Sequence, residues 1–308
     1  MTYANQRVAY GQALVDLGAK DESVVVLDAD LGSSTMGRMF EDRFPERHFE
    51  VGIAEANMTS MAAGLALTGK VAFVNSFAAF AVNRAYDQIK QSVALGNVNV
   101  KIVGSSAGLS DFGDGATHQS VEDMAAMRAL PNMTVINPAD PNEAYQATLA
   151  IAEINGPAYL RINRNDYAST TPQGEKFVIG QPVVMRDGDD IAVFATGYMV
   201  NLALDAARLL EGRVSVRVVN IHTIKPMDPK KITAAVGGCK AIVTAEEHSV
   251  TGGLGSAVAE VLRHNPKPMA FVGIEDNFGR SAHGYQDLLD YFDLTPERIV
   301  KAVLKMNT

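Results

Sequence analysis

The sequence predicts an α/β protein of two consecutive domains, each built on a mostly parallel sheet. Short β-branched runs alternate with helical patterns almost from end to end, which is typical of sheets covered by helices on both faces. The 308 residues are enough to bury two cores. The alternation lapses between Asn163 and Gly188, where the composition indicates a linker with room for one hairpin. We therefore expect domains at residues 1–165 and 189–308, joined by a linker at 166–188.

The first domain is expected to contain five strands and five helices. β-branched runs predict the strands Val24–Leu27, Val71–Asn75, Val98–Val103, Thr134–Ile136 and Ala158–Ile162. Apolar residues at helical spacing predict the helices Arg7–Leu17, Glu55–Leu67, Arg84–Leu95, Val121–Leu130 and Asn142–Ile154. Ser120, with Asp123 three residues later, predicts a cap for the fourth of these helices.

The second domain repeats the alternation. Its expected strands are Ile191–Ala195, Val214–Val219, Ala241–Ala245 and Met269–Val272. Its expected helices are Val200–Leu210, Ser256–Leu262, Tyr285–Tyr291 and Pro296–Leu304.

Charge and composition exclude several classes of partner. The formal net charge is −8 and no Lys/Arg run occurs, so nucleic acid and anionic membrane surfaces are poor partners. No apolar run reaches the ~18 residues of a membrane span, and the first residues lack the pattern of a signal peptide. The single cysteine, Cys239, excludes a disulfide framework and is expected to be a core residue. We therefore expect a cytoplasmic protein.

Glu55 lies in the small, apolar run "EVGIAEANM", which should be buried. A buried carboxylate is costly unless it shifts its pKa or finds a partner. The alternative is that Glu55 only begins a helix, where an acidic residue complements the helix dipole.

Phe77 and Phe80 follow a predicted strand, in "SFAAFAVNRAYDQIK". Ligands of parallel sheets bind at the carboxyl ends of strands, so the two rings are candidates for one wall of a flat aromatic site. Aromatic residues three apart at a helix start also fit a core role equally well.

The glycine-rich loop "GLSDFGDGATHQSVED" contains Asp111, Asp114 and His118. A histidine among carboxylates in a strand-end loop is a candidate for proton transfer or for binding a polar substrate. A surface loop with a helix cap is the simpler reading, but long loops at strand ends usually carry function. "GDG" also imitates a thiamine diphosphate metal signature, with Asn142 as the second ligand. We reject that metal site because Asn142 lies at a helix start after two prolines.

Several cations and hydroxyls are dispersed along the first domain. They are Arg7 on the first predicted helix, Ser33 and Ser34 after the first strand, and Arg161 and Arg164 after the fifth. If they converge, they can hold a phosphate through charge-assisted hydrogen bonds.

Taken together, the chain resembles the C-terminal two-thirds of a transketolase. The matching segments follow the family's order across nearly the whole chain: "DADLGSS", "VGIAEANM", "SFAAFAVNRAYDQIK", "GDGATHQSVEDMAAMRALPNM", "INPAD", "PAYLRINRN", "IHTIKPMD" and "EEHSVTGGLGSAVAEVL". The resemblance implies a thiamine pyrimidine-binding domain followed by a transketolase C-terminal-like domain.

The resemblance also implies roles for the candidate residues. Glu55 matches the glutamate that hydrogen-bonds N1′ of the thiamine aminopyrimidine, where a buried carboxyl of raised pKa favours the imino tautomer. Phe77 and Phe80 match the aromatic pair on that ring, and Asp30 a carboxylate near the cofactor. By the same comparison, Asp114 and His118 contact the sugar, with His118 moving a proton. Arg7, Ser34 and Arg164 match the group that binds the sugar's phosphate.

In the family, the diphosphate and its Mg²⁺ or Ca²⁺ bind a separate N-terminal domain. The resemblance therefore implies one subunit of a split transketolase, which transfers a two-carbon ketol unit between sugar phosphates. Alone it would be inactive. With an N-terminal diphosphate-binding subunit it would form a heterotetramer that contains a dimer of this chain. Two departures from the family bear on substrate choice: Ser106 replaces a histidine that many members have, and Asn83 replaces a tyrosine.

Three alternatives stay open. A β subunit of a 2-oxoacid dehydrogenase shares the two-domain arrangement, although it has no need of a phosphate site. "RAYDQ" and "DGATHQ" lean toward deoxyxylulose phosphate synthases. A non-catalytic binding module is the third, although it would need none of the candidate residues.

Overall fold

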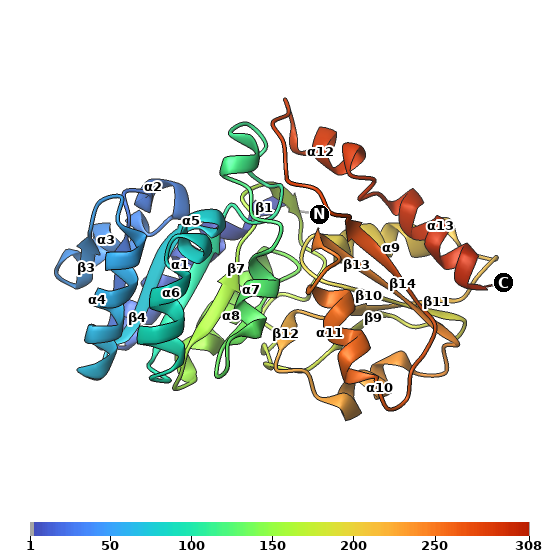
Figure 1. The fold of residues 1–308 in the computed structure, drawn as a ribbon, viewed down its shortest axis with the longest axis horizontal. Helices are drawn as coiled ribbons and strands as arrows, with labels where there is room; N and C mark the ends of the chain where they lie inside the picture. The colour runs from blue at the N-terminus through green and yellow to red at the C-terminus, as the bar shows by residue number, and fades with distance from the viewer. Residues whose placement is uncertain (1–2, 308) are drawn as a thin grey trace.

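The computed structural model describes residues 3–307, which form two α/β units side by side (Figure 1). The first unit is built on a seven-stranded sheet and the second on a five-stranded sheet. This is the two-domain, mostly parallel α/β fold that the alternating pattern predicts.

The first sheet has the strand order β12-β6-β7-β5-β4-β2-β3, and all its pairs are parallel except β12 with β6. Its strands are β2 (Val24–Asp28), β3 (His48–Glu50), β4 (Val71–Phe77), β5 (Val100–Ser105), β6 (Thr134–Ile136), β7 (Ala158–Arg161) and β12 (Thr223–Lys225). The central strands β2, β4 and β5 are buried along their whole length, as expected of a sheet covered on both faces.

Helices cover both faces of this sheet. The helices and helical turns are α1 (Gln6–Lys20), α2 (Gly32–Thr35), α3 (Arg38–Arg43), η1 (Pro45–Arg47), α4 (Glu55–Leu67), α5 (Ala78–Asn83), α6 (Tyr86–Gln88), η2 (Ile89–Ala94), η3 (Gly115–Thr117), α7 (Asp123–Ala129) and α8 (Pro141–Glu153). Side chains of α1, α3 and α8 share one core cluster, and those of α4, α5, η2 and α7 share another. The two clusters lie on opposite faces of the sheet, since successive strand residues point to opposite sides.

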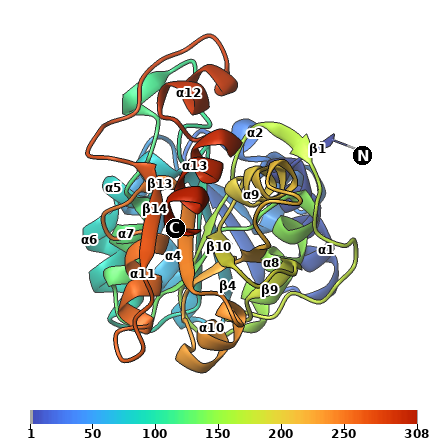
Figure 2. The ribbon, with the colours of Figure 1, turned by 90° about the vertical axis from the view of Figure 1, so that its right-hand side faces the viewer.

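The second sheet has the order β14-β13-β10-β11-β9, in which only β9 is antiparallel. Its elements are β9 (Val183–Arg186), β10 (Ile191–Ala195), α9 (Met199–Leu209), β11 (Val216–Asn220), α10 (Pro229–Val236), β13 (Ala241–Ser249), α11 (Leu254–Val261), β14 (Met269–Ile274), α12 (Tyr285–Tyr291) and α13 (Pro296–Asn307). Helices α9 and α13 pack together against this sheet, and the view along the long axis shows them with α10 and α11 around it (Figure 2).

The two units are joined by more than the linker. Strand β12 belongs by sequence to the second unit but pairs antiparallel with β6 of the first sheet. One hydrophobic cluster runs from α4 and α7 of the first unit to α10 and α11 of the second. This continuous core holds the two units in one arrangement.

The expected hairpin in the linker is wrong. The linker, residues 166–188, contains both β8 (Asp166–Ala168) and β9, but these strands do not pair with each other. Strand β8 pairs antiparallel with β1 (Tyr3–Asn5), and β9 joins the second sheet beside β11. Each of the two strands pairs with a strand outside the linker, and this pairing satisfies its backbone N–H and C=O groups.

Two differences from the predicted helix boundaries lie close to the candidate residues. The predicted helix Arg84–Leu95 is preceded by α5, which starts six residues earlier at Ala78. The predicted cap at Ser120 is also wrong, because α7 begins at Asp123 with Glu122 as its N-cap residue. The Ser120 backbone instead pairs with Gly108 in an isolated bridge that closes a loop.

Among residues 3–307, no helix is both long and apolar enough to cross a membrane.

Candidate active site

Glu55 is the first residue of α4 and is almost fully buried, with 4% of its surface exposed. The residue therefore begins a helix and also buries a carboxylate, as its apolar surroundings in the sequence predict. The cost of that burial is offset by Arg84, whose Nη1 donates to Glu55 Oε1 over 3.1 Å. The Arg84 side chain is half exposed, so this charge lies between the buried carboxylate and the surface.

Phe77 and Phe80 lie next to this ion pair, at the carboxyl end of β4 and in α5. Their ring centroids are 5.8 Å apart and the rings are nearly parallel, at 22°. The Arg84 guanidinium lies 4.1 Å from the centre of the Phe80 ring. Arg84 therefore connects the carboxylate of Glu55 to the aromatic pair.

His118 approaches the same two rings from the 108–120 loop, which follows β5. Its ring meets Phe80 edge-on with the centroids 5.0 Å apart, and Phe77 at 6.3 Å. The Thr117 hydroxyl lies 3.0 Å from His118 Nδ1 and fixes one side of the imidazole. Asp114 is exposed in the same loop, four residues earlier. The loop thus places its histidine at the aromatic pair and a carboxylate at the surface nearby.

The residues that are predicted to bind the phosphate lie near Phe77 and near one another. Arg7 Nη1 donates to the backbone carbonyl of Ser34 over 2.8 Å, and the Arg164 guanidinium lies 5.8 Å from the Phe77 ring centre. Burial, and then repulsion from the Arg164 charge, lower the pKa of Arg7, while the charges of Asp166 and Asp111 raise it. Two partly buried cations that repel each other favour an anion between them.

Asp111 balances part of this positive charge. Arg164 Nη1 donates to Asp111 Oδ2 over 2.7 Å. Burial raises the pKa of Asp111, while the Arg164 charge lowers it. An anionic ligand at Arg164 would therefore compete with Asp111.

The remaining predicted residues lie at the edges of the site. Asp30 is exposed in the turn after β2, where its backbone N–H donates to Glu50 Oε1 over 2.8 Å. Asn83 lies at the end of α5 and donates to Glu122 Oε1 over 2.8 Å. Ser106 is buried after β5, and its backbone adopts φ +52°, a conformation that costs a non-glycine residue energy.

The loop aspartate and Asn142 do not form a common site. Asn142 lies on α8 and donates to the Thr171 carbonyl over 2.9 Å. Across residues 3–307, no group of three or more His, Cys, Asp or Glu side chains is arranged to hold a metal ion.

This arrangement fits one part of a flat heteroaromatic cofactor. A buried carboxylate beside two stacked aromatic rings offers a hydrogen bond to a ring nitrogen and an apolar face for the ring. The sequence indicated the buried carboxylate and the aromatic pair. It did not indicate that Arg84 pairs with Glu55 or that Asp111 pairs with Arg164. Arg84 lies four residues after Phe80 in a helical pattern, so their contact follows from helical spacing.

Comparisons with known proteins agree with these observations. Residues 3–170 match the family model described as "Transketolase, pyrimidine binding domain", and residues 180–299 match "Transketolase, C-terminal domain". The chain is 44% identical over 308 residues to a putative transketolase C-terminal section of Methanocaldococcus jannaschii, covering 98% of this chain and 96% of that protein. It is 42% identical over 299 residues to a 6-deoxy-6-sulfo-D-fructose transketolase subunit of a Clostridium species, covering 96% and 92%.

Among solved structures, the chain is similar to one described as a split gene transketolase, inactive β4 tetramer. The two superpose with a TM-score of 0.91 at 42% identity, over 99% of each chain.

Proposed function

This chain belongs to the transketolase family, and we propose that it is the C-terminal subunit of a split transketolase that depends on thiamine diphosphate. The observation that carries the proposal is the buried Glu55 carboxylate beside the stacked rings of Phe77 and Phe80. These are the two contacts that an aminopyrimidine ring needs from its protein: an acid at a ring nitrogen and an apolar wall.

When bound, thiamine diphosphate supplies the carbanion chemistry that moves a two-carbon ketol unit between sugars. Glu55 would hold a proton at the pyrimidine N1′, and Phe77 and Phe80 would orient the ring. Asp30 would lie near the cofactor, at the end of β2. The chain thus provides orientation and one proton contact.

His118 would bind a hydroxyl or carbonyl oxygen of the sugar and move a proton there, since its ring faces the aromatic pair. Asp114 would bind a second sugar hydroxyl from the same loop. Arg7, Ser34 and Arg164 would hold the substrate's phosphate, with Arg164 exchanging Asp111 for it. The convergence of these cations supports phosphorylated sugars as substrates.

We propose that an N-terminal subunit supplies the diphosphate site and the ligands for Mg²⁺ or Ca²⁺. Two copies of this chain would form a dimer within a heterotetramer, and the chain alone would be inactive. The similar solved structure is described as a split gene transketolase, inactive β4 tetramer, which supports partner dependence. We expect the enzyme to work in the cytoplasm.

Co-expression with the diphosphate-binding subunit tests this function. Ketol transfer between sugar phosphates that requires both chains, thiamine diphosphate and Mg²⁺ would support it. A complex that decarboxylates a 2-oxoacid, or one that condenses pyruvate with a sugar aldehyde, would instead identify a dehydrogenase or a synthase of the deoxyxylulose phosphate type. The absence of any diphosphate-binding partner would favour a non-catalytic module.

A further inference from the structure

We propose that the second unit holds the 108–120 loop in its working position, and that Gln119 and Glu247 are the positioning residues. This inference rests on the proposed function, because that function assigns Asp114 and His118 of the loop to the sugar. It gives the second unit a task in the site although none of the candidate site residues lies in it.

The base of the loop rests on Glu247, a buried residue of β13. The Leu109 backbone N–H donates to Glu247 Oε1 over 2.7 Å. Tyr285 donates its hydroxyl to Glu247 Oε2 over 2.8 Å, so the carboxylate has partners on both oxygens. At Gly108, where φ is +63°, a Cβ atom would meet this carboxylate. The start of the loop is therefore built against the second unit at close range.

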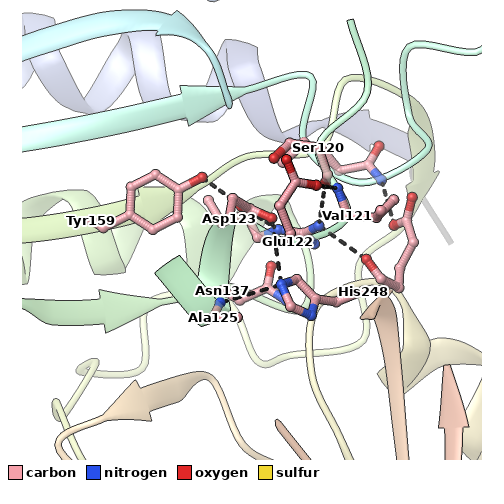
Figure 3. A network of polar contacts seen from close by, with 12 residues as sticks. Ser120, Val121, Glu122, Asp123, Ala125, Asn137, Tyr159 and His248 are labelled. Carbon is pink, nitrogen blue, oxygen red and sulfur yellow. Dashed lines mark hydrogen bonds and ion pairs between the residues drawn. The ribbon is translucent and has the colours of Figure 1, made fainter. Parts of the chain in front are cut away.

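A buried polar network continues from this base. Arg161 donates through Nη2 to the Glu247 carbonyl over 3.0 Å and through Nε to Asp123 Oδ2 over 2.8 Å. Figure 3 shows the Tyr159 hydroxyl directed at Asp123 and the His248 ring lying against the backbone of Ala125. The network spans β7 and α7 of the first unit and β13 of the second, so it fixes both ends of the loop relative to the second sheet.

The tip of the loop is held by the segment between β14 and α12. The two segments rise side by side at the top of Figure 1. Gln119 Nε2 donates to the Asp111 carbonyl over 2.9 Å and to the Arg280 carbonyl over 3.0 Å. The Ala282 N–H donates to the Phe112 carbonyl over 2.8 Å.

Apolar contacts support the same arrangement. Leu109 is fully buried in the hydrophobic cluster of the second unit, and Phe112 packs against that cluster. Gly115 has φ +78°, and a Cβ atom there would meet the side chain of Ser281. The turn that carries Asp114 and His118 therefore lies directly on the second unit.

Gln119 links the loop to the second unit, because its amide donates both to the Asp111 carbonyl within the loop and to the Arg280 carbonyl of the second unit. Its position depends on Gly279, where a Cβ atom would collide with Gln119 Oε1. Gly279 is not among the residues with positive φ, so its backbone accepts alanine. Gly279→Ala should therefore displace the Gln119 amide without straining the backbone.

The experiment compares Gly279→Ala with Gly238→Ala, which is also in the second unit and has no atom within 4 Å of its Cβ position. Hydrogen–deuterium exchange of the isolated chain reports on the loop without any substrate. We expect amides of residues 108–118 to exchange about tenfold faster in Gly279→Ala, and at the wild-type rate in Gly238→Ala.

In the complex with the diphosphate-binding subunit, D-xylulose 5-phosphate serves as the donor probe. Gly279→Ala should raise its KM about tenfold and leave the affinity for thiamine diphosphate unchanged. In a Gln119→Ala background, Gly279→Ala should add little further change, since the colliding Oε1 and Cδ atoms are gone and only the contact with the Cβ of residue 119, at 3.1 Å, remains.

Wild-type exchange in the 108–118 segment of both Gly279→Ala and Gln119→Ala would overturn the inference. Exchange that rises equally throughout the second unit would also overturn it, because the effect would then be general unfolding. If no ketol transfer is found in the two-chain complex, the proposed function fails, while the exchange result still decides whether the second unit holds the loop.

Discussion

The guanidinium of Arg84 donates a hydrogen bond to the buried carboxylate of Glu55 and lies over the ring of Phe80. Glu55, on α4, and Arg84, just after α5, are 29 positions apart in the sequence. A carboxylate that is almost fully buried thereby has a partner that is half exposed. In the proposed enzyme, the pyrimidine ring would approach the same carboxylate. Arg84 would then either share the Glu55 carboxylate with the ring or give up its hydrogen bond to it.

The Arg84–Glu55 pair should contribute measurable coupling to the stability of the isolated chain. A double-mutant cycle of Arg84→Met and Glu55→Gln, followed by urea unfolding, should give a coupling of about 1 kcal/mol, the upper end for a partly exposed pair. The exposed i,i+4 pair Arg38–Asp42, joined over 2.9 Å, is the control and should show a smaller coupling, about 0.3–0.5 kcal/mol. Strictly additive effects of the first two substitutions would contradict the assignment.

His118→Ala should reduce sugar turnover far more than cofactor binding. The imidazole touches the edges of the aromatic rings and has its Nδ1 at Thr117, which leaves the other nitrogen for the sugar. Loss of a proton-transfer group should lower kcat/KM by about 10²–10⁴-fold, with thiamine diphosphate affinity unchanged. The exposed His264 provides the control substitution. Equal losses of turnover and cofactor affinity would mean a collapsed site.

Arg164→Met should weaken the reaction of phosphorylated sugars selectively. A charge-assisted hydrogen bond contributes about 1.5–3 kcal/mol, so kcat/KM for D-xylulose 5-phosphate should fall about 10- to 100-fold. The value for unphosphorylated D-xylulose should stay the same. Arg213→Met, at an exposed position of the second unit, is the control. A loss of the same size with both sugars would show that Arg164 does not bind the phosphate.

His248 should make the interface between the units sensitive to acid. Burial lowers the pKa of this histidine to about 4 from 6.5, although the Asp123 charge raises it. The unfolded chain therefore binds a proton between these values and the folded chain does not, so this residue's contribution to stability falls as pH drops from 6.5 toward 4.

The variant His248→Gln isolates that contribution, since it removes the titrating group. Relative to wild type, the variant should gain unfolding free energy as pH falls from 7 to 5 in urea titrations. The comparison is needed because burial raises the pKa of neighbouring Glu246 to about 7, which gives the opposite slope between 4.5 and 7. A difference between the two proteins that does not change with pH would contradict this prediction.

The sequence predicted those parts of the fold and site that depend on local patterns. The fully buried strands β2, β4 and β5 read as β-branched runs, and the polar residues directly after them mark the carboxyl edge of the sheet. Glu55 stood out because a single carboxylate interrupted an apolar run. The aromatic pair and His118 were found by their place at strand ends.

The rest depends on contacts between distant parts of the chain. Strand β12 is short and leaves its own unit to pair with β6, which no local pattern signals. Glu247 and Leu109 are 138 positions apart, and Gln119 and Arg280 are 161 apart. In the sequence, Glu247 belongs to the segment "EEHSVTGGLGSAVAEVL", just after a predicted buried strand. Nothing in that segment indicates that its carboxylate contacts the 108–120 loop.

The central claim is that Glu55 forms the proton contact of the proposed enzyme, and Glu55→Gln in the two-chain complex tests it most directly. The amide keeps the size of the side chain but holds no exchangeable carboxyl proton. The complex should therefore assemble like wild type and lose no more stability than the ion pair with Arg84 contributes, about 1 kcal/mol. The account predicts that ketol transfer from D-xylulose 5-phosphate then falls by at least about 10²-fold. Wild-type turnover in an assembled Glu55→Gln complex would contradict it.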